Sequence, residues 1–179
     1  GENILLVKYP IYSLKPTGPK INKILRDPSE KDRNIKEYDF QQLYIQNRQD
    51  FQPTLKLLLA SGFTVLAEDY VGTGIAWGVT NSIMSDGENE SKLNKLIKTF
   101  EKLNKGLLKP DIAILLDGER FSSGIEKSHR NEDRGNLVWE LNRKVYQRLA
   151  KVYSWKSVKA NQTIESVHKD IWEIISKSS

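Results

Sequence analysis

Three short apolar runs constrain the fold of this chain more than any other feature of its sequence. They span residues 4–7, 63–67 and 112–116, are rich in branched side chains, and each ends at polar residues. Runs of this length and composition are typical of parallel strands that are buried on both faces. Helical periodicity is present at residues 38–60, 91–103, 136–153 and 164–175, and a shorter fourth strand is expected at 157–159. The alternation predicts an α/β fold, with an open parallel sheet, helices on both faces and right-handed crossovers.

The composition narrows the class of protein. The 179 residues suit one domain rather than two. With no Cys and only two His, the chain cannot build a disulfide framework, a thiolate nucleophile, or a metal site made of Cys or several His. No apolar stretch approaches the roughly 20 residues of a membrane span. We therefore expect a cytoplasmic enzyme or binding protein that does not associate with membranes.

The charge balance is basic but dispersed. The chain carries 28 Lys and Arg against 23 Asp and Glu, a net charge of +5. Its lysines are mixed with acids, as in Lys92, Lys95 and Lys98 beside Glu90 and Glu101, which is typical of a solvated helix face. No basic stripe with interleaved aromatic residues is visible. We therefore expect no nucleic-acid partner, and favour attraction to a phosphorylated small molecule.

Charged residues gather where the expected strands end. Lys8 closes the first strand, Glu68 and Asp69 the second, and Asp117 the third. Ligands of open α/β sheets bind beyond these carboxyl ends. Two adjacent carboxylates repel each other unless a cation or hydrogen-bond donors lie between them, which favours a functional role for Glu68 and Asp69. Asp117 has an equally simple alternative role, as the cap of a helix that follows at residue 119.

An arginine interrupts the apolar face of the helix expected at residues 38–60. Phe40 and Tyr44 share this face with later apolar residues, and Arg48 lies on it four residues after Tyr44. Its guanidinium either reaches past the stripe to water or to a structural carboxylate, or it stacks on Tyr44 and presents its donors to a planar heterocycle. Pro53 removes one hydrogen bond from this helix, and a kink there would tilt the Tyr44 face toward a cleft.

Two further segments each have two interpretations. Small residues at 72–78 open a helix directly after the carboxylates, so that either a ligand or a neighbouring element can approach closely. Arg120, Arg130 and Arg134 lie in the polar, glycine-punctuated segment 118–135. This segment is either an exposed loop or a lid that brings cations onto phosphate groups.

The order of these features resembles thymidylate kinases and the wider nucleoside monophosphate kinase group of the P-loop superfamily. The resemblance covers nearly the whole chain and depends on the order and spacing of several short motifs. These motifs are Lys8-Tyr9-Pro10 with Thr17-Gly18, Leu43-Tyr44-Ile45-Gln46-Asn47-Arg48, Glu68-Asp69-Tyr70 with Thr73-Gly74 and Ala76-Trp77, and Leu108-Lys109-Pro110-Asp111. The resemblance implies that residues 1–179 form one three-layer P-loop kinase-like domain, with 118–135 as its lid.

The resemblance also implies an activity, the transfer of the terminal phosphoryl group of ATP to dTMP with Mg²⁺. Tyr44 would stack on the pyrimidine, Arg48 would donate to its edge, and Tyr70 would pack against the deoxyribose. Glu68 would act in catalysis and help to hold Mg²⁺. The lid arginines Arg130 and Arg134 would act in catalysis by neutralising phosphoryl charge. The remaining substrate-binding residues would be Lys8, Asp69, Thr73 and Trp77. Nucleotide substrates are then the partners, and a homodimer is compatible with this class, in which dimers are common.

Asp69 departs from the family pattern, which has an arginine that meets the acceptor phosphate at this position. The change reverses the sign of a charge beside a dianion. Either Lys8 or a lid arginine takes over that role, or the acceptor has no phosphate, as in the deoxynucleoside kinases of the same superfamily. A catalytically inactive module that binds nucleotide or a partner is the third alternative.

The phosphate-binding loop Gly-x-x-x-x-Gly-Lys-Ser/Thr is absent, because none of the 11 glycines is followed by lysine. In the family this loop follows a first strand that lies between the strands matching Val65 and Ile114. We therefore expect these two strands not to pair directly with each other. Without the missing unit the sheet would have open edges and exposed apolar faces. About 30 or more residues before Gly1, or a second chain, are expected to supply it.

Overall fold

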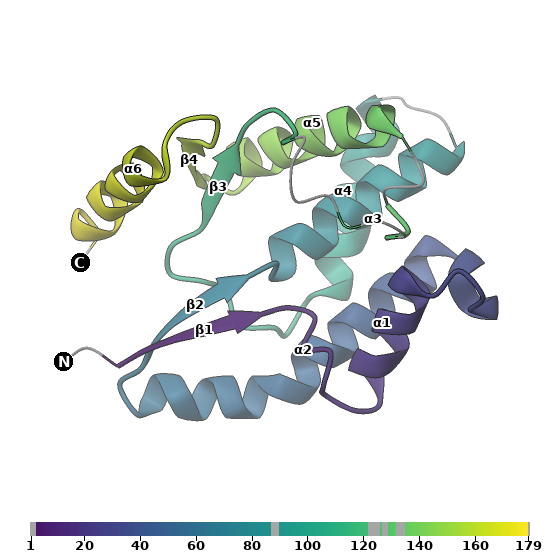
Figure 1. The fold of residues 1–179 in the computed structure, drawn as a ribbon, viewed down its shortest axis with the longest axis horizontal. Coiled ribbons are helices and arrows are strands. Elements are labelled where there is room, and N and C mark those ends of the chain that lie inside the picture. Colours follow the sequence, from purple (N-terminus) through teal and green to yellow (C-terminus); the bar gives the residue numbers. More distant parts are fainter. Residues whose placement is uncertain (1–2, 87–89, 122–125, 127–128, 132–134, 179) are drawn as a thin grey trace.

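Strands and helices alternate along the chain in the computed structural model, which describes residues 3–86, 90–121, 126, 129–131 and 135–178 (Figure 1). The strands are β1 (Ile4–Lys8), β2 (Thr64–Glu68), β3 (Ile114–Asp117) and β4 (Lys156–Lys159). The helices are α1 (Thr17–Arg26), the 3₁₀ helix η1 (Lys31–Asn34), α2 (Glu37–Ala60), α3 (Val71–Asp86), α4 (Glu90–Leu103), α5 (Asn136–Val152) and α6 (Ile164–Ser176). Each expected strand and helix is present with small shifts at its ends, whereas α1 was not expected.

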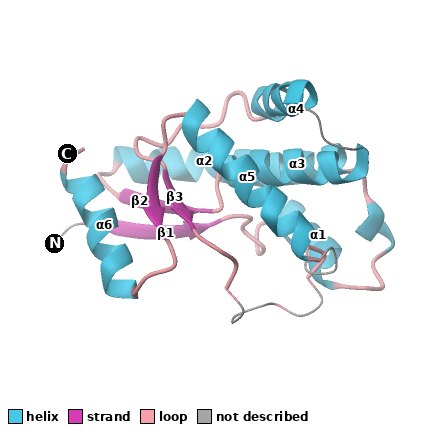
Figure 2. Ribbon diagram, turned by 90° about the horizontal axis from the view of Figure 1, so that it is seen from above, coloured by secondary structure: helices cyan, strands magenta, loops and turns pink. Residues whose placement is uncertain are grey.

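The strands form two separate parallel pairs. β1 pairs with β2, with Leu6 opposite Leu66, and β3 pairs with β4, with Leu116 opposite Val158. Within the described part of the chain, no strand joins the two pairs. The prediction that β2 and β3 do not pair directly with each other is therefore confirmed. Figures 1 and 2 both show the strands and α6 at the end of the molecule where the chain termini lie, away from α1.

The strands are more exposed than the sequence predicts. Leu6, Leu66 and Leu116 are 65%, 49% and 52% exposed, and Ile4 is 54% exposed. The prediction of strands buried on both faces is therefore wrong for the described chain. The physical reason is that both outer edges of each pair are unpaired among the described residues, and the apolar side chains lack the neighbours that a complete sheet provides.

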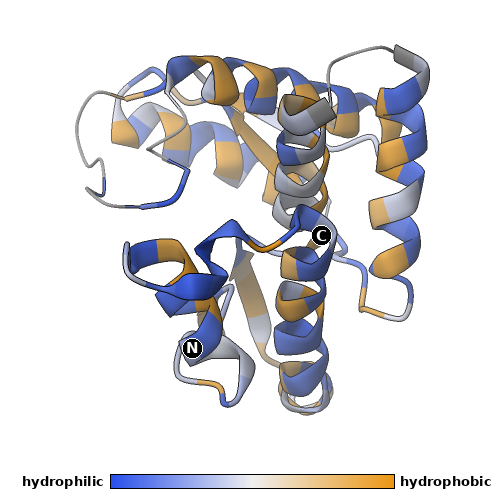
Figure 3. Ribbon diagram, turned by 90° about the vertical axis from the view of Figure 1, so that its right-hand side faces the viewer, coloured by the Kyte–Doolittle hydropathy of each residue, from blue (hydrophilic) through white to orange (hydrophobic). Residues whose placement is uncertain are grey.

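Two clusters of helical side chains form most of the core. The larger lies between α3, α4 and α5, and the smaller between α1 and α2. Each cluster packs the apolar stripes of amphipathic helices, whose orange and blue residues alternate in Figure 3. The buried residues of the larger cluster are Ile75, Ala76, Val79, Ile83, Ile97, Phe100, Val145 and Leu149. Those of the smaller cluster are Ile21, Ile24, Leu25 and Phe40.

Helix α3 approaches its neighbours closely at two glycines. A Cβ added to Gly72 would lie 2.5 Å from the ring of Trp155, and one added to Gly78 would lie 2.8 Å from the ring of Phe100. Packing therefore requires glycine at both positions. At Gly74, between them, the closest neighbour is the guanidinium of Arg48 instead of an apolar ring.

Helix α2 carries much of the predicted binding face. It continues without interruption through Pro53. Phe40, Arg48 and Leu55 are 3%, 2% and 6% exposed, so this side of the helix faces the interior as predicted. None of the described helices has the combination of length and apolar character that a membrane span requires.

Candidate active site

A cavity of about 370 Å³ lies at the carboxyl ends of β1 and β2. Helices α2, α3 and α5 form its walls together with the loop after β1 and residues 129 and 131. Its lining includes six of the seven predicted substrate-binding residues, namely Lys8, Tyr44, Arg48, Asp69, Thr73 and Trp77. The volume suits a small organic ligand. The strand-end location and the Tyr44–Arg48 face, which the sequence indicated separately, thus belong to one cavity.

Arg48 is buried with much of its hydrogen-bonding capacity unused. It is 2% exposed, and its Nη2 donates to the backbone oxygens of Asp69 (3.3 Å) and Tyr70 (3.0 Å). Its Nε and Nη1 have no hydrogen-bond partner among the described residues. Burial lowers the pKa of Arg48 to about 10, despite the nearby tyrosines. The interpretation that Arg48 reaches past the stripe to water is therefore wrong.

The surroundings of Arg48 leave its guanidinium facing the cavity. Tyr44 lies 5.9 Å from the guanidinium carbon, measured to the ring centroid. A Cβ at Gly74 would come within 2.9 Å of Nη1, so glycine makes room for the guanidinium on the α3 side. No carboxylate of the described chain forms an ion pair with Arg48 within 4.0 Å. Arg48 thus lines the cavity with donors at Nε and Nη1 that no acceptor of the described chain uses.

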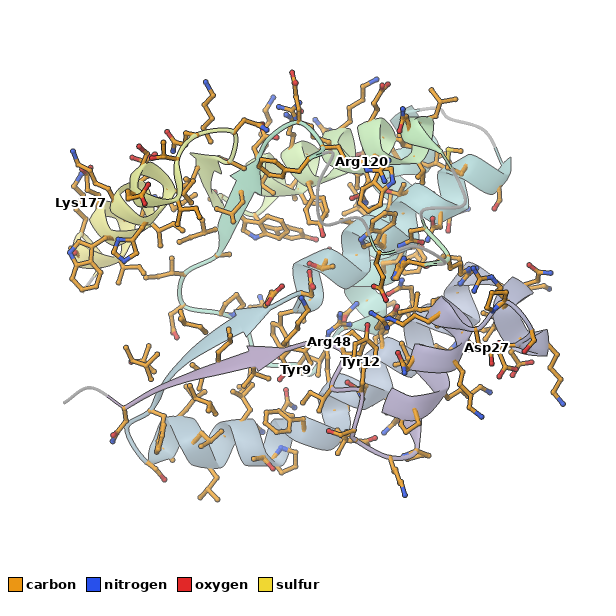
Figure 4. The ribbon with its side chains drawn as sticks, viewed as in Figure 1. Tyr9, Tyr12, Asp27, Arg48, Arg120 and Lys177 are labelled. Carbon is orange, nitrogen blue, oxygen red and sulfur yellow. The ribbon has the colours of Figure 1, made fainter. Side chains whose placement is uncertain are left out.

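Asn47 holds the loop between β1 and α1 in place. The sequence analysis did not single out this residue. Asn47 is fully buried, at 0% exposed. Its Oδ1 accepts from Ile11 N (2.7 Å), and its Nδ2 donates to Ile11 O (3.1 Å) and Thr17 Oγ1 (3.0 Å). These bonds hold the loop that carries Tyr9 and Tyr12, which Figure 4 shows with Arg48 near the end of β1. The only signal in the sequence was a second polar residue next to Arg48.

Tyrosines enclose the inner side of Arg48. The rings of Tyr9 and Tyr70 lie 5.0 Å apart, and Tyr9 is 1% exposed. Burial raises the pKa of Tyr9 to about 12. The hydroxyls of both tyrosines have no hydrogen-bond partner in the described part of the chain. Tyr70 is not among the lining residues of the cavity, so its predicted contact with a deoxyribose stays a prediction.

The strand-end charges form a compact group. Lys8 Nζ lies 2.6 Å from Glu68 Oε1 and 4.0 Å from Asp69 Oδ2. A cation does lie between the two carboxylates, as their repulsion required. The hydrogen bond to Glu68 raises the pKa of Lys8, and partial burial raises the pKa of Asp69. Thr73 Oγ1 donates to Asp69 Oδ1 at 3.4 Å, at the beginning of α3.

Glu68 is the residue that could hold Mg²⁺. In phosphoryl-transfer sites this ion is bound by one or two carboxylates together with substrate phosphates. The half-exposed carboxylate of Glu68 at the strand end suits this mode. Elsewhere in the described chain, no group of three or more His, Cys, Asp and Glu could enclose a metal ion. The donor set therefore fits a metal that arrives with its substrate.

The structure places the lid arginines differently from one another. Arg130 is 8% exposed, and its backbone N–H donates to Leu25 O (2.8 Å) and its Nη2 to Ile35 O (3.3 Å). Its Nη2 also lies 4.0 Å from Glu37 Oε2. Arg120 lies over the ring of Trp139, and Arg134 is outside the described residues. Arg130 is thus anchored to the α1–α2 region, and the predicted catalytic role of Arg130 and Arg134 stays a prediction.

Asp117 has a structural role that differs from the predicted helix cap. Its Oδ1 accepts from Arg143 Nε (2.8 Å) and its Oδ2 from Gln147 Nε2 (2.9 Å), both on α5. Residue 119 is not in a helix. The cap prediction is therefore wrong, because a helix far along the chain supplies the donors that Asp117 accepts. Asp117 connects the end of β3 to α5.

A family model described as thymidylate kinase matches residues 8–171. The chain belongs to the thymidylate kinase family. The human thymidylate kinase is 24% identical over 174 residues, covering 96% of this chain and 74% of the human protein. The thymidylate kinase of Danio rerio is 24% identical, covering 87% of this chain and 69% of its own length. A protein of Invertebrate iridescent virus 6 is 25% identical over 146 residues, or 81% of this chain.

A solved structure supports the fold of the thymidylate kinase-like domain. Thymidylate kinase from Candida albicans superposes with a TM-score of 0.78 at 22% identity, covering 97% of this chain and 80% of that structure. The P-loop kinase-like α/β fold expected from the sequence is therefore confirmed. This chain spans 63% of the length of the viral relative, so the relatives contain segments without a counterpart here.

Proposed function

We propose that this chain is the acceptor-binding part of a kinase that transfers the terminal phosphoryl group of ATP to dTMP. The observation that carries the proposal is Arg48, a buried cation at 2% exposure whose Nε and Nη1 have no partner in the described chain. A buried donor without an acceptor costs free energy, about 1–3 kcal/mol for an unsatisfied group. A ligand with acceptor atoms in a plane removes that cost.

A pyrimidine meets the requirements of this end of the cavity. Its ring carbonyls are acceptors for the guanidinium fork of Arg48, which is planar and directional. Tyr44 and Trp77 line the same cavity and offer aromatic faces for the base. Tyr70 supports Arg48 through its backbone oxygen and contributes the deoxyribose contact in this proposal.

The strand-end residues take the reacting end of the acceptor. Phosphoryl transfer requires alignment of the two substrates and compensation of negative charge, with little covalent chemistry from the protein. Glu68 holds Mg²⁺ in this proposal, and the ion supplies charge compensation on the phosphates. Lys8, Thr73 and Asp69 position the acceptor, and the lid segment 118–135 brings Arg130 and Arg134 toward the phosphates.

The donor phosphates require a binding loop that these 179 residues do not contain. The unpaired edges of β2 and β3 and the exposed Leu66 and Leu116 indicate where it belongs. We place the loop at the end of a parallel strand between β2 and β3, supplied by residues other than these 179. Such a strand would pair with both edges and cover apolar side chains at the centre of the sheet.

A second candidate acceptor is the nucleoside thymidine. Asp69 favours it, because a carboxylate lining the strand end of the cavity suits a hydroxyl better than a phosphate dianion. The third alternative, an inactive binding module, is disfavoured by the unused donors of Arg48, which a purely structural chain has no reason to bury.

The test is an assay of the full-length gene product with ATP, Mg²⁺ and a panel of nucleotides and nucleosides, measuring ADP release. We expect turnover with dTMP or thymidine and little with purine acceptors. A well-folded protein that turns over none of them would leave the inactive module as the remaining function. The proposal includes a cytoplasmic location and no nucleic-acid partner, and a homodimer is testable by light scattering.

A further inference from the structure

Arg26, near the end of α1, lies at the edge of the cavity and has no role in the site described above. Its guanidinium carbon lies 4.6 Å from the centroid of the Tyr12 ring. Tyr12 lines the cavity, and so does Leu25, the residue before Arg26. The Arg26 side chain is 32% exposed, so solvent reaches it. A ligand that fills the cavity as far as Tyr12 therefore comes close to a guanidinium group.

Arg26 binds a carboxylate in the way that a guanidinium binds a phosphate. Its Nε donates to Glu126 Oε1, and its Nη2 donates to Glu126 Oε2 (3.0 Å). This two-bond arrangement suits the oxygens of a carboxylate and those of a phosphate equally well. The third nitrogen, Nη1, donates to Asn22 Oδ1 (2.8 Å) one turn earlier on α1, which holds the guanidinium in its orientation. The Glu126 carboxylate therefore marks a position where an anion is bound.

Further cationic side chains face the same position. The hydrogen bonds from Arg26 lower the pKa of Glu126 most, and His129 and Lys8 add to this effect. Lys8 and His129 line the cavity together with Tyr12. An anion in place of the carboxylate is therefore attracted from α1 and from the end of β1. Because the Glu126 side chain is 47% exposed, moving its carboxylate into water costs little free energy.

The loop after β1 connects this position to the base end of the cavity. Asn47, next to Arg48 on α2, accepts from Ile11 N (2.7 Å) and donates to Ile11 O (3.1 Å). Tyr12 follows Ile11 in the chain, so these bonds also fix the ring on which Arg26 lies. A ligand whose base is bound at Arg48 can extend toward Tyr12 within the same cavity.

We propose that Arg26 binds the phosphate group of a nucleoside monophosphate acceptor, and that the Glu126 carboxylate occupies this position until the phosphate displaces it. This inference rests on the proposed phosphoryl transfer to dTMP and adds the residue that recognises the acceptor phosphate. It provides the cation that the strand end lacks, where Asp69 lines the cavity and Lys8 is hydrogen-bonded to Glu68 at 2.6 Å.

Matched variants separate this role from a structural one. Arg26→Ala removes the guanidinium, and Arg26→Lys keeps the charge without the planar fork. Glu126→Gln removes the competing charge and keeps the shape of the side chain. Lys23→Ala on α1 and Glu140→Gln on α5 make the same changes of net charge at exposed positions and serve as controls.

The experiment measures binding of dTMP and of thymidine to the full-length gene product by calorimetry, and thermal unfolding checks that each variant is folded. We expect Arg26→Ala to weaken dTMP binding about 10- to 100-fold, and Arg26→Lys to recover part of this loss. Glu126→Gln should tighten dTMP binding about threefold, the size of an exposed ion pair. Thymidine has no phosphate, so its affinity should stay the same in every variant. The two controls should change neither ligand.

Three results would overturn the inference. The first is an Arg26→Ala variant that binds dTMP as tightly as the unmodified protein does. The second is an equal loss of dTMP and thymidine binding in Arg26→Ala and Arg26→Lys, which would make Arg26 a structural residue. The third is unchanged dTMP affinity in Glu126→Gln, which would remove the competition. In all three cases nucleotide binding by the unmodified protein persists, whereas a folded protein that binds neither ligand would overturn the proposed function itself.

Discussion

The cavity and the strand edges differ in how completely the described chain buries their side chains. Around the cavity, Asn47, Arg48 and Tyr9 are 0%, 2% and 1% exposed, and helices and loops of the described chain hold them. At the edges, Leu6 and Leu66 are 65% and 49% exposed on strands whose composition suits an interior. The difference teaches that helical packing within the described chain encloses the cavity, whereas no described element covers the apolar side chains at the strand edges.

The largest expected effect is on stability, and it distinguishes a sheet whose centre is covered by a further strand from a sheet whose centre is open. Leu66→Ala and Leu116→Ala should each lower the free energy of unfolding of the full-length gene product by about 2–5 kcal/mol, because a covering strand buries both side chains. In residues 1–179 alone, where these side chains are about half exposed, the loss should be much smaller. Urea denaturation measures both values.

The control for this comparison is Leu57→Ala on α2, at a site 68% exposed, which should cost less than about 0.5 kcal/mol in either protein. Equal and small losses at all three positions would contradict the covered sheet centre and leave the exposed leucines as an ordinary surface.

The next effect concerns the reacting end of the cavity. Glu68→Gln should lower kcat about 100-fold, which corresponds to an increase of about 2.7 kcal/mol in the activation free energy. The neutral amide cannot balance the charge of Mg²⁺ in the way that a carboxylate does. The acceptor KM should change little. Steady-state kinetics with varied acceptor and Mg²⁺ measure both constants. A rate equal to that of the unmodified protein would remove Glu68 from the mechanism.

At the base end, Arg48→Ala should weaken acceptor binding by about 1.5–3 kcal/mol, the range for hydrogen bonds to a charged group. Arg48→Lys should recover little of this loss, because an ammonium cannot reproduce the planar fork. Calorimetric titration with the acceptor measures the change. Lys56→Ala on the exposed side of α2 is the control, and acceptor affinity preserved in Arg48→Ala would contradict the assigned role.

The smallest effect belongs to the β3 end, outside the cavity. Partial burial alone would raise the pKa of Asp117, but hydrogen bonds from Arg143 and Gln147 outweigh it and lower the pKa. A carboxyl whose pKa is lowered by folding stabilises the protein above its ordinary value of about 3.9, and the contribution disappears as the pH falls through the folded pKa. Asp117→Asn should therefore cost about 0.5–1 kcal/mol at pH 7.

Thermal or urea unfolding of the Asp117→Asn variant between pH 7 and pH 3 measures this difference. The two proteins should converge at the acidic end. A difference that stays constant across that range would show that shape, and not charge, connects Asp117 to α5.

The sequence predicted most elements because local patterns specify them. Apolar runs and helical periods that alternate along the chain placed the strands and helices, and the strand-end rule placed Lys8, Glu68 and Asp69 together. Arg48 was predicted separately, on the face of a helix, and the structure brings it to the same cavity as Lys8 and Asp69. The role of Asn47 was not predicted because it depends on hydrogen bonds to Ile11 and Thr17, which lie 30 or more residues away in the chain. Asp117 was misassigned for a similar reason, since its partners lie on α5.

The sequence by itself determined the alternation of strands and helices, the apolar character of the strands, and the absence of a phosphate-binding loop, because each depends on neighbouring residues. Only the tertiary structure decided that Arg48 is buried with unused donors, and that Lys8 is the cation that lies between the two carboxylates. These features arise from contacts between residues distant in the sequence, and no local pattern contains the distances that make them.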